Sequence, residues 1–248
     1  VWVATLQTME YSAIAFYSGF RERLPGVIAK AFPYRLVWRL LIDSSETYIG
    51  AMAHEAFHAF QGVERPERLA AAERVRSLED AYPWEDDELE AMWKEELNLL
   101  HSAVEAPSDG EAAVLARQFV AQRARRRAQP GMTPALADYE RKQEWLEGLA
   151  KYVELAIQLE AAQTPDYEPF PGLADDPDFR GYRTRERFWS NQIDEVKRMQ
   201  NRSGDTRFYY CGAAQGVLLD RLMPDWKAKV WQEGVWLEDL VAEVVDSE

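Results

Sequence analysis

The chain has 248 residues and a formal net charge of −14, with 43 Asp and Glu residues against 29 Lys and Arg residues. This acidic balance argues against a nucleic-acid-binding surface, and no apolar run approaches the ~20 residues that a transmembrane helix needs. The single cysteine, Cys211, excludes an intrachain disulfide and a cysteine-based zinc cluster. With 47% hydrophobic residues, the chain is expected to be globular with a sizeable core.

The first elements are predicted to be a helix and then a strand. Residues 1–32 carry apolar side chains at helical spacing, with a break or restart at Pro25. Residues 33–43 have the aromatic and branched side chains typical of a strand. Ser44 or Ser45 then caps the next helix. Because only 33–43 is clearly strand-like, the expected fold class is α+β, mostly α with a small sheet.

The helix after this cap contains an H-E-x-x-H motif, formed by His54, Glu55 and His58. Histidines four residues apart lie on one face of a helix, so both imidazoles can reach one metal ion, and the glutamate can take a proton from a bound water. At about 100° per residue the three polar side chains share one side, and we expect the apolar remainder to anchor the helix in the core. The alternative, surface or core histidines without a metal, is disfavoured because burying such a cluster is costly.

The segment from 66 to 130 reads as a helical insertion, with helices over 66–80, 86–105 and 109–128. The last of these ends in a basic run, Arg123, Arg125, Arg126 and Arg127. Cations are favoured at a helix C-terminus, so a solvated or ion-paired face is expected rather than a nucleic-acid patch. The third histidine, His101, sits on an ordinary amphipathic helix and is expected to be solvated or capped.

A mononuclear zinc site needs a third protein ligand and leaves a fourth position for water. With no histidine well placed, a carboxylate is expected, and the candidates lie in one helical segment that contains Glu144, Glu147 and Glu154. Gly148 would cost about 1 kcal/mol in a helix interior relative to Ala. A glycine there indicates that another backbone or a ligand approaches closely.

The H-E-x-x-H motif followed by E-G-x-A-x-Y-x-E, which begins at Glu147, resembles the gluzincin zinc metallopeptidases and uncharacterised bacterial metallopeptidase-like proteins. The resemblance implies a zincin-like domain in which His54, His58 and Glu147 bind Zn²⁺ and Glu154 supports the site from behind the ligands. It also implies that the strand before the motif pairs with an extended peptide substrate. Glu147 lies 89 positions after His58, much further than in the best-known gluzincins, so no substrate preference is carried over.

A proline-rich stretch, about 164–178, is predicted to be a loop before a helical C-terminal part, about 179–248. There Tyr209 and Tyr210 begin a helix of small residues that permits close packing beside the metal site. Either tyrosine could stabilise the oxyanion of a tetrahedral intermediate, with Tyr182 and Arg183 as alternatives. The competing interpretation is that both are core aromatics with wet hydroxyls.

The sequence as a whole predicts a zinc-dependent hydrolase acting on peptides or proteins, with Glu55 as general base. Two other hypotheses remain: a non-catalytic zinc site that staples two helices together, and an inactive peptidase-like binding protein. The chain begins at Val1 rather than at methionine, which indicates a removed upstream segment or an expression boundary, and we favour export.

Overall fold

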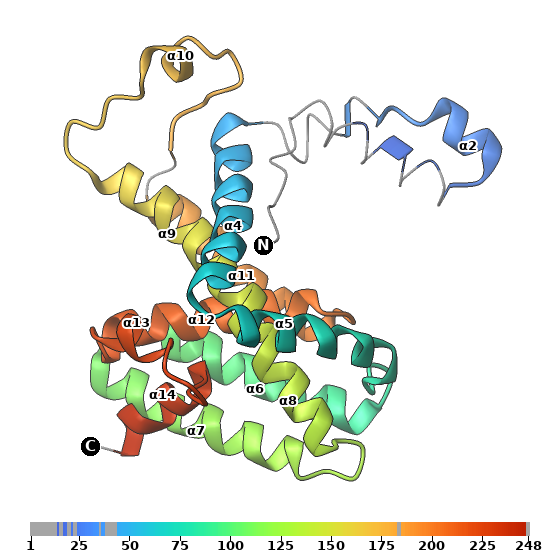
Figure 1. Cartoon of the computed structure of the whole chain (residues 1–248), viewed down its shortest axis with the longest axis vertical. Helices are drawn as coiled ribbons and strands as arrows, with labels where there is room; N and C mark the ends of the chain where they lie inside the picture. The colour runs from blue at the N-terminus through green and yellow to red at the C-terminus, as the bar shows by residue number, and fades with distance from the viewer. Residues whose placement is uncertain are drawn as a thin grey trace.

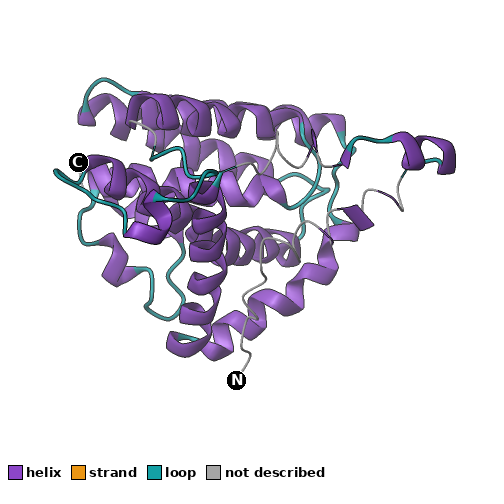
Figure 2. Ribbon diagram, turned by 90° about the horizontal axis from the view of Figure 1, so that it is seen from above, coloured by secondary structure: helices purple, strands orange, loops and turns teal. Residues whose placement is uncertain are grey.

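The computed structural model describes residues 14, 17, 18, 21, 24–34, 36, 37, 44–182 and 185–246, and within this part of the chain every regular element is a helix (Figure 2). In chain order the α-helices are α2 (Gly26–Ala31), α4 (Ser45–Glu64), α5 (Pro66–Val75), α6 (Asp87–Glu105), α7 (Asp109–Arg127), α8 (Pro134–Gln143), α9 (Leu149–Gln163), α10 (Pro171–Ala174), α11 (Arg185–Arg198), α12 (Thr206–Leu222), α13 (Trp226–Lys229) and α14 (Leu237–Asp246). Two short 3₁₀ helices, η1 (Arg76–Ala81) and η3 (Met199–Asn201), and one π-helix, η2 (Glu144–Gly148), join them.

The predicted α+β class, with its zincin-like domain and small sheet, is wrong: the described residues contain helices and no strand. Within the expected strand, Tyr34, Leu36 and Val37 are helical, and residues 38–43 lie outside the described part. The backbone N–H of Val37 donates to Pro33 O at 3.0 Å, so local hydrogen bonds prevail over the strand preference of aromatic and branched side chains. The described residues therefore contain no edge strand that could pair with a peptide.

The helical insertion forms much of a bundle. Figure 1 shows α6, α7, α8, α12 and α14 as a compact lower body, while α4 and α9 cross and extend beyond it towards α10. Asp86 caps α6 by accepting the N–H of Leu89 at 3.0 Å, and Ser108 caps α7 by accepting that of Glu111 at 3.3 Å. The core of this body contains the large buried side chains Trp93, Phe119, Tyr139, Trp145, Phe208 and Trp226.

The basic run at the end of α7 is ion-paired, but much of it is buried. Arg123 bonds Glu96, Glu144 and Glu238, and Arg126 bonds Glu96 and Glu140, with N···O distances between 2.6 and 2.8 Å for the closest contacts. Both arginines are almost fully excluded from solvent. Buried charges require such complete pairing. Because the paired residues lie on different elements, the network joins α6, α7, α8, η2 and α14.

The orientation of α4 differs from the expected one. Its buried positions include Glu46, Gly50, His54 and Gln61, so the polar stripe is the face that meets the rest of the molecule. On the apolar side of the helix, which was expected to be buried in the core, Ala56 and Phe60 are exposed. The apolar pattern indicated the helix correctly and its buried face wrongly, because α4 packs on η2 and α9 through the face that carries His54, His58 and Gln61.

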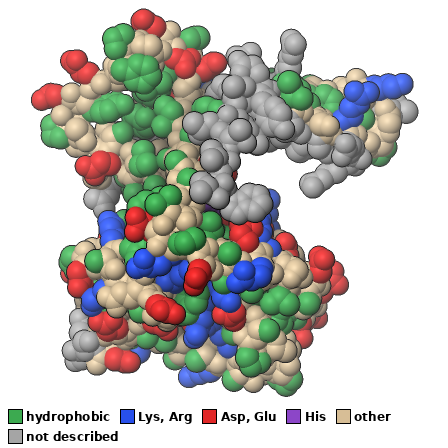
Figure 3. Space-filling view, in the orientation of Figure 1, with side chains coloured by type: hydrophobic (Ala, Val, Ile, Leu, Met, Phe, Trp, Pro, Cys, Tyr) green, Lys and Arg blue, Asp and Glu red, His purple; other side chains and the backbone are tan. Residues whose placement is uncertain are grey.

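The proline-rich stretch is a loop, as predicted, around the single turn of α10. It docks on the start of α4, where Ser45 Oγ donates to Asp176 Oδ2 at 2.5 Å and Ser45 N donates to Asp178 O at 3.1 Å. Hydrophobic side chains gather near α10 on the face shown in Figure 3. Phe170, directly before α10, is 68% exposed. None of the described helices is long and apolar enough to cross a bilayer.

Candidate metal centre

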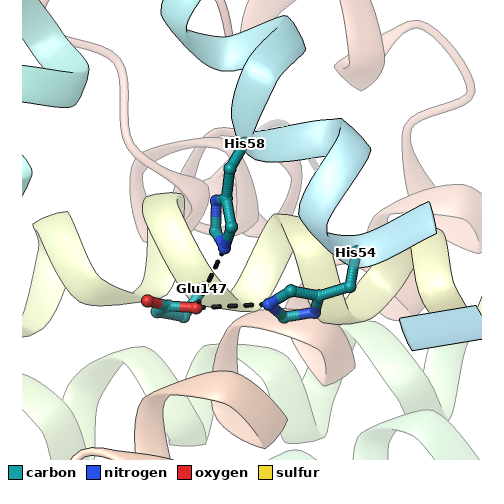
Figure 4. A group of neighbouring side chains, drawn as sticks. All are labelled: His54, His58 and Glu147. Atoms are coloured by element: carbon teal, nitrogen blue, oxygen red, sulfur yellow. Dashed lines mark hydrogen bonds and ion pairs between the residues drawn. The ribbon is translucent and has the colours of Figure 1, made fainter. Parts of the chain in front are cut away.

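Helix α4 and the π-helix η2 bring His54, His58 and Glu147 together, as Figure 4 shows. The Nε2 atoms of both histidines lie 3.3 Å from Glu147 Oε2, and the three possible ligand atoms are all within 4.8 Å of one another. Zinc binds N and O ligands at ~2.0–2.1 Å, which in a tetrahedral site separates neighbouring ligand atoms by ~3.3 Å. This group could therefore hold a metal ion.

Gln61 sets the orientation of His58. Its side chain is fully buried, and its Nε2 donates to the backbone oxygens of Trp145 at 2.8 Å and Leu146 at 3.2 Å. Its Oε1 is therefore the acceptor for His58 Nδ1, at 2.8 Å. Because Nδ1 carries the proton in this assignment, the lone pair of His58 is on Nε2, which faces Glu147.

Glu154 does the same for His54, at longer range. Its Oε2 lies 3.5 Å from His54 Nδ1, an ion-pair distance rather than a short hydrogen bond, which leaves His54 Nε2 facing Glu147. Burial lowers the pKa of His54, but Glu147 and Glu154 outweigh it and raise that pKa to about 9. A site that favours positive charge at this imidazole also favours a metal cation in the place of the proton.

Glu147 is held on its other side. Its Oε1 lies 3.5 Å from Arg76 Nη1, at the start of η1, which leaves Oε2 for the two histidines. Burial raises the pKa of Glu147, but hydrogen bonds from His54, His58 and Tyr209 lower it well below its usual range. Glu147 is therefore an ionised carboxylate, as a metal ligand must be.

The local backbone explains the placement of Glu147. A π-helix adds a residue to the turn, and such turns are frequent at functional sites. The side-chain amide of Gln61 donates to two of the turn's carbonyl oxygens. Directly after Glu147, a Cβ on Gly148 would lie 2.6 Å from Gly212 Cα, so the predicted close approach of a backbone is present and comes from α12.

A pocket of about 270 Å³ opens beside the trio. It is lined by Ala51, His54, Glu55, Lys151, Glu154, Thr206, Tyr209 and Tyr210. Glu55 is exposed on its rim. The ring of Tyr209 stacks on that of His54, with centroids 5.8 Å apart and an interplanar angle of 11°, and its hydroxyl bonds Glu147. Tyr210 instead faces Lys151, whose Nζ lies 5.3 Å from the ring centroid.

Apart from Glu154, the described alternative ligands and donors lie away from the trio. Glu144 is held by Arg123 through two contacts of 2.7 and 2.8 Å, and so belongs to the ionic network. His101 is outside the trio, and its buried Nε2 has no hydrogen-bond partner among the described residues. Tyr182 packs against Tyr167 and Phe179 in the proline-rich loop. Arg183 lies outside the described residues.

Sequence reasoning missed Gln61 and Arg76, and it gave Lys151 no role. Gln61 lies seven positions after His54, where two helical turns return a side chain to the same face, so spacing contained a signal for it. Arg76 is 71 residues from Glu147, and only tertiary structure brings it there.

We found no matching family model, curated protein or solved structure for this chain. The likeness to gluzincins therefore rests on the motif residues alone.

Proposed function

We propose that this protein is a zinc-dependent hydrolase that cleaves peptide bonds. The convergence of His54 Nε2, His58 Nε2 and Glu147 Oε2 carries the proposal, because Gln61 and Glu154 contact the Nδ1 atoms of the two imidazoles and leave both Nε2 atoms facing Glu147. Two imidazoles and one carboxylate suit zinc in a catalytic site with three protein ligands. A zinc ion bound there would supply Lewis acidity, making a water molecule more acidic and polarising a substrate carbonyl.

Glu55 is the general base in this proposal. It lies on the same helix as both histidines and lines the open pocket, so its carboxylate has access to water and substrate. Glu55 takes the proton of the attacking water and then delivers it to the leaving amine.

Tyr209 is the preferred donor to the oxyanion. Burial and the neighbouring Glu147 raise its pKa, so its hydroxyl keeps its proton at neutral pH and can donate it in a hydrogen bond. Tyr210 also lines the pocket, but it packs against Lys151 and its contact with the trio is less direct. We therefore assign Tyr210 to the pocket wall.

The non-catalytic alternative is a zinc ion that only joins α4 to α9. A closed structural site has four protein ligands, whereas the group contains three among the described residues. The open pocket and the exposed Glu55 favour the catalytic proposal.

Hydrolysis of a mixed peptide library by the zinc-loaded protein tests the proposal, with Glu55→Gln as the comparison. We expect cleavage by the wild type and a loss of at least 10²-fold in kcat with Glu55→Gln, the lower end of a general base's contribution, at unchanged zinc content. Equal turnover by both proteins would refute the role of Glu55. A zinc-loaded wild type that cleaves no peptide would refute the peptidase proposal.

A further inference from the structure

Among the described residues that line the pocket beside the trio, Lys151 is the one lysine or arginine, and the proposed chemistry does not use it. Lys151 lies on α9, one turn after Glu147, and its side chain is only 12% exposed. Its ammonium nitrogen lies 5.3 Å from the centroid of the Tyr210 ring. A buried lysine needs partners for its charge, so the contacts of this ammonium show what it can still bind.

Among the described residues, the one hydrogen-bond acceptor of Lys151 Nζ is Glu154 Oε1, at 2.6 Å. An ammonium has three N–H donors, so two remain for a ligand. The other oxygen of Glu154 faces His54 Nδ1 at 3.5 Å. This chain of contacts holds the ammonium close to the metal ligands, at one wall of a pocket large enough for about one or two amino-acid residues.

The charge of the pocket also permits an anionic ligand, despite the acidity of the whole chain. With a divalent cation on the trio, the negative charges of Glu55, Glu147 and Glu154 are offset by that cation and by Lys151. Arg76 adds a further positive charge against Glu147. The occupied pocket would therefore not repel a carboxylate, and Lys151 would attract one.

We infer that Lys151 binds a carboxylate of the substrate next to the scissile bond, which makes the pocket selective for carboxylate-bearing peptides. The inference rests on the proposed function. The carboxylate has two possible sources, the free C-terminus of the peptide or an acidic side chain. The selectivity comes from the two free N–H groups of Lys151, with Thr206 and Tyr210 completing the wall around them.

The test uses two sets of matched peptides. In the first set the C-terminus is either a free carboxylate or an amide. In the second set an Asp or Glu residue is replaced by Asn or Gln. Zinc-loaded wild type, Lys151→Met and a control, Lys142→Met, are assayed. Lys142 on α8 is a suitable control because it is similarly covered, at 17% exposure, and pairs with Asp138 at 2.6 Å. We expect the wild type and Lys142→Met to prefer one carboxylate source by about tenfold or more in kcat/KM, and Lys151→Met to lose that preference while keeping its zinc.

A binding measurement supplies a readout that does not depend on turnover. Calorimetry on the zinc-loaded Glu55→Gln protein, with and without Lys151→Met, uses N-acetylglycine and its amide as probes. Tighter binding of the acid that is lost with Lys151→Met supports the inference, even if no peptide is cleaved and the proposed function fails. Equal binding of acid and amide, or acid binding that persists in Lys151→Met because the metal holds it, overturns the inference. So does a variant that slows all substrates equally while the preference remains, because Lys151 would then act only through Glu154.

Discussion

At the residue scale, the most informative side chain is Gln61. Its amide joins His58 to the backbone of the π-helix that carries Glu147. It therefore links two of the three candidate metal ligands, His58 and Glu147, which are distant in sequence. Groups behind metal ligands fix the tautomer and orientation of imidazoles, and losing them typically costs 10–100-fold in metal affinity or activity.

We therefore expect Gln61→Leu to weaken zinc binding by about 10–100-fold, measured by competition with a chromophoric chelator. Gln143→Leu is the matched control: Gln143 is equally buried and donates to Ala72 O at 3.2 Å, away from the trio. Both variants remove a buried amide, but only the first should change zinc affinity. Equal losses in the two would show that Gln61 acts through general stability.

The three residues that could hold a metal ion were predictable from sequence, and the residues that support them less so. His54 and His58 share a helical face by spacing, and Glu147 follows from the second motif. Arg76 could not be placed, because its contact with Glu147 depends on how η1 packs around the site. Position 61 was readable as the same face of α4, yet nothing in the sequence states that its amide meets the carbonyls of 145 and 146.

At the element scale, the contact between η2 and α12 controls the site. Gly148 and Gly212 face each other so closely that a Cβ on either would lie within 2.7 Å of the other's Cα. Gln215 adds a hydrogen bond from its Nε2 to Glu144 Oε2 at 2.9 Å. This close approach brings Tyr209 onto His54 and fixes the turn that presents Glu147.

Gly148→Ala should separate these two backbones. We expect a decrease of about 1–3 kcal/mol or more in the free energy of unfolding, measured by urea denaturation, together with weaker zinc binding. Gly110→Ala is the control, since a Cβ there meets nothing within 4 Å, and in α7 it should be neutral or stabilise by up to about 1 kcal/mol. A Gly148→Ala protein as stable as the wild type would contradict the close packing.

Helix positions were predicted better than helix environment. The helices expected at 86–105 and 109–128 are confirmed as α6 and α7 to within about a residue, because their caps and periodicity are local features. The strand expected at 33–43 was inferred from composition alone, which does not distinguish a strand from a helix in a short apolar run. The buried face of α4 was assigned to the wrong side because apolar residues were assumed to face inward.

At the scale of the whole molecule, a buried ionic network connects the lower bundle to the metal centre. Glu144 belongs to this network and is three residues before Glu147 on the same π-helix, so the network anchors the turn that carries the ligand. At the far end of the network, Glu238 on α14 forms ion pairs with Arg123, Arg127 and Arg141. These pairs tie together elements that are distant in sequence.

The network should make stability depend on acidity. Burial raises the pKa of Glu238, but the arginines outweigh it and lower that pKa to about 2. A carboxyl whose folded pKa is depressed contributes stability above its unfolded pKa and loses it as pH falls through the folded value. We therefore expect the unfolding free energy to fall between about pH 4.5 and 2, by on the order of 2–3 kcal/mol from this group.

Urea unfolding across this pH range checks the expectation. Glu238→Gln should be less stable than the wild type at neutral pH and show a weaker loss towards pH 2. Glu243→Gln, on the same helix and in an exposed pair with Lys229, should keep the pH dependence of the wild type. Parallel curves for Glu238→Gln and the wild type would exclude this role of Glu238.

The central claim is that His54, His58 and Glu147 bind one zinc ion, and the most direct test is the metal content of the purified protein by elemental analysis. The variant is Glu147→Ala, and the control is Glu160→Ala, which removes an exposed carboxylate from α9, the helix that follows η2. We expect one zinc per chain in the wild type and the control, and little or none in Glu147→Ala. A wild type that takes up no zinc when it is offered, or a Glu147→Ala protein that keeps a full equivalent, would contradict the claim.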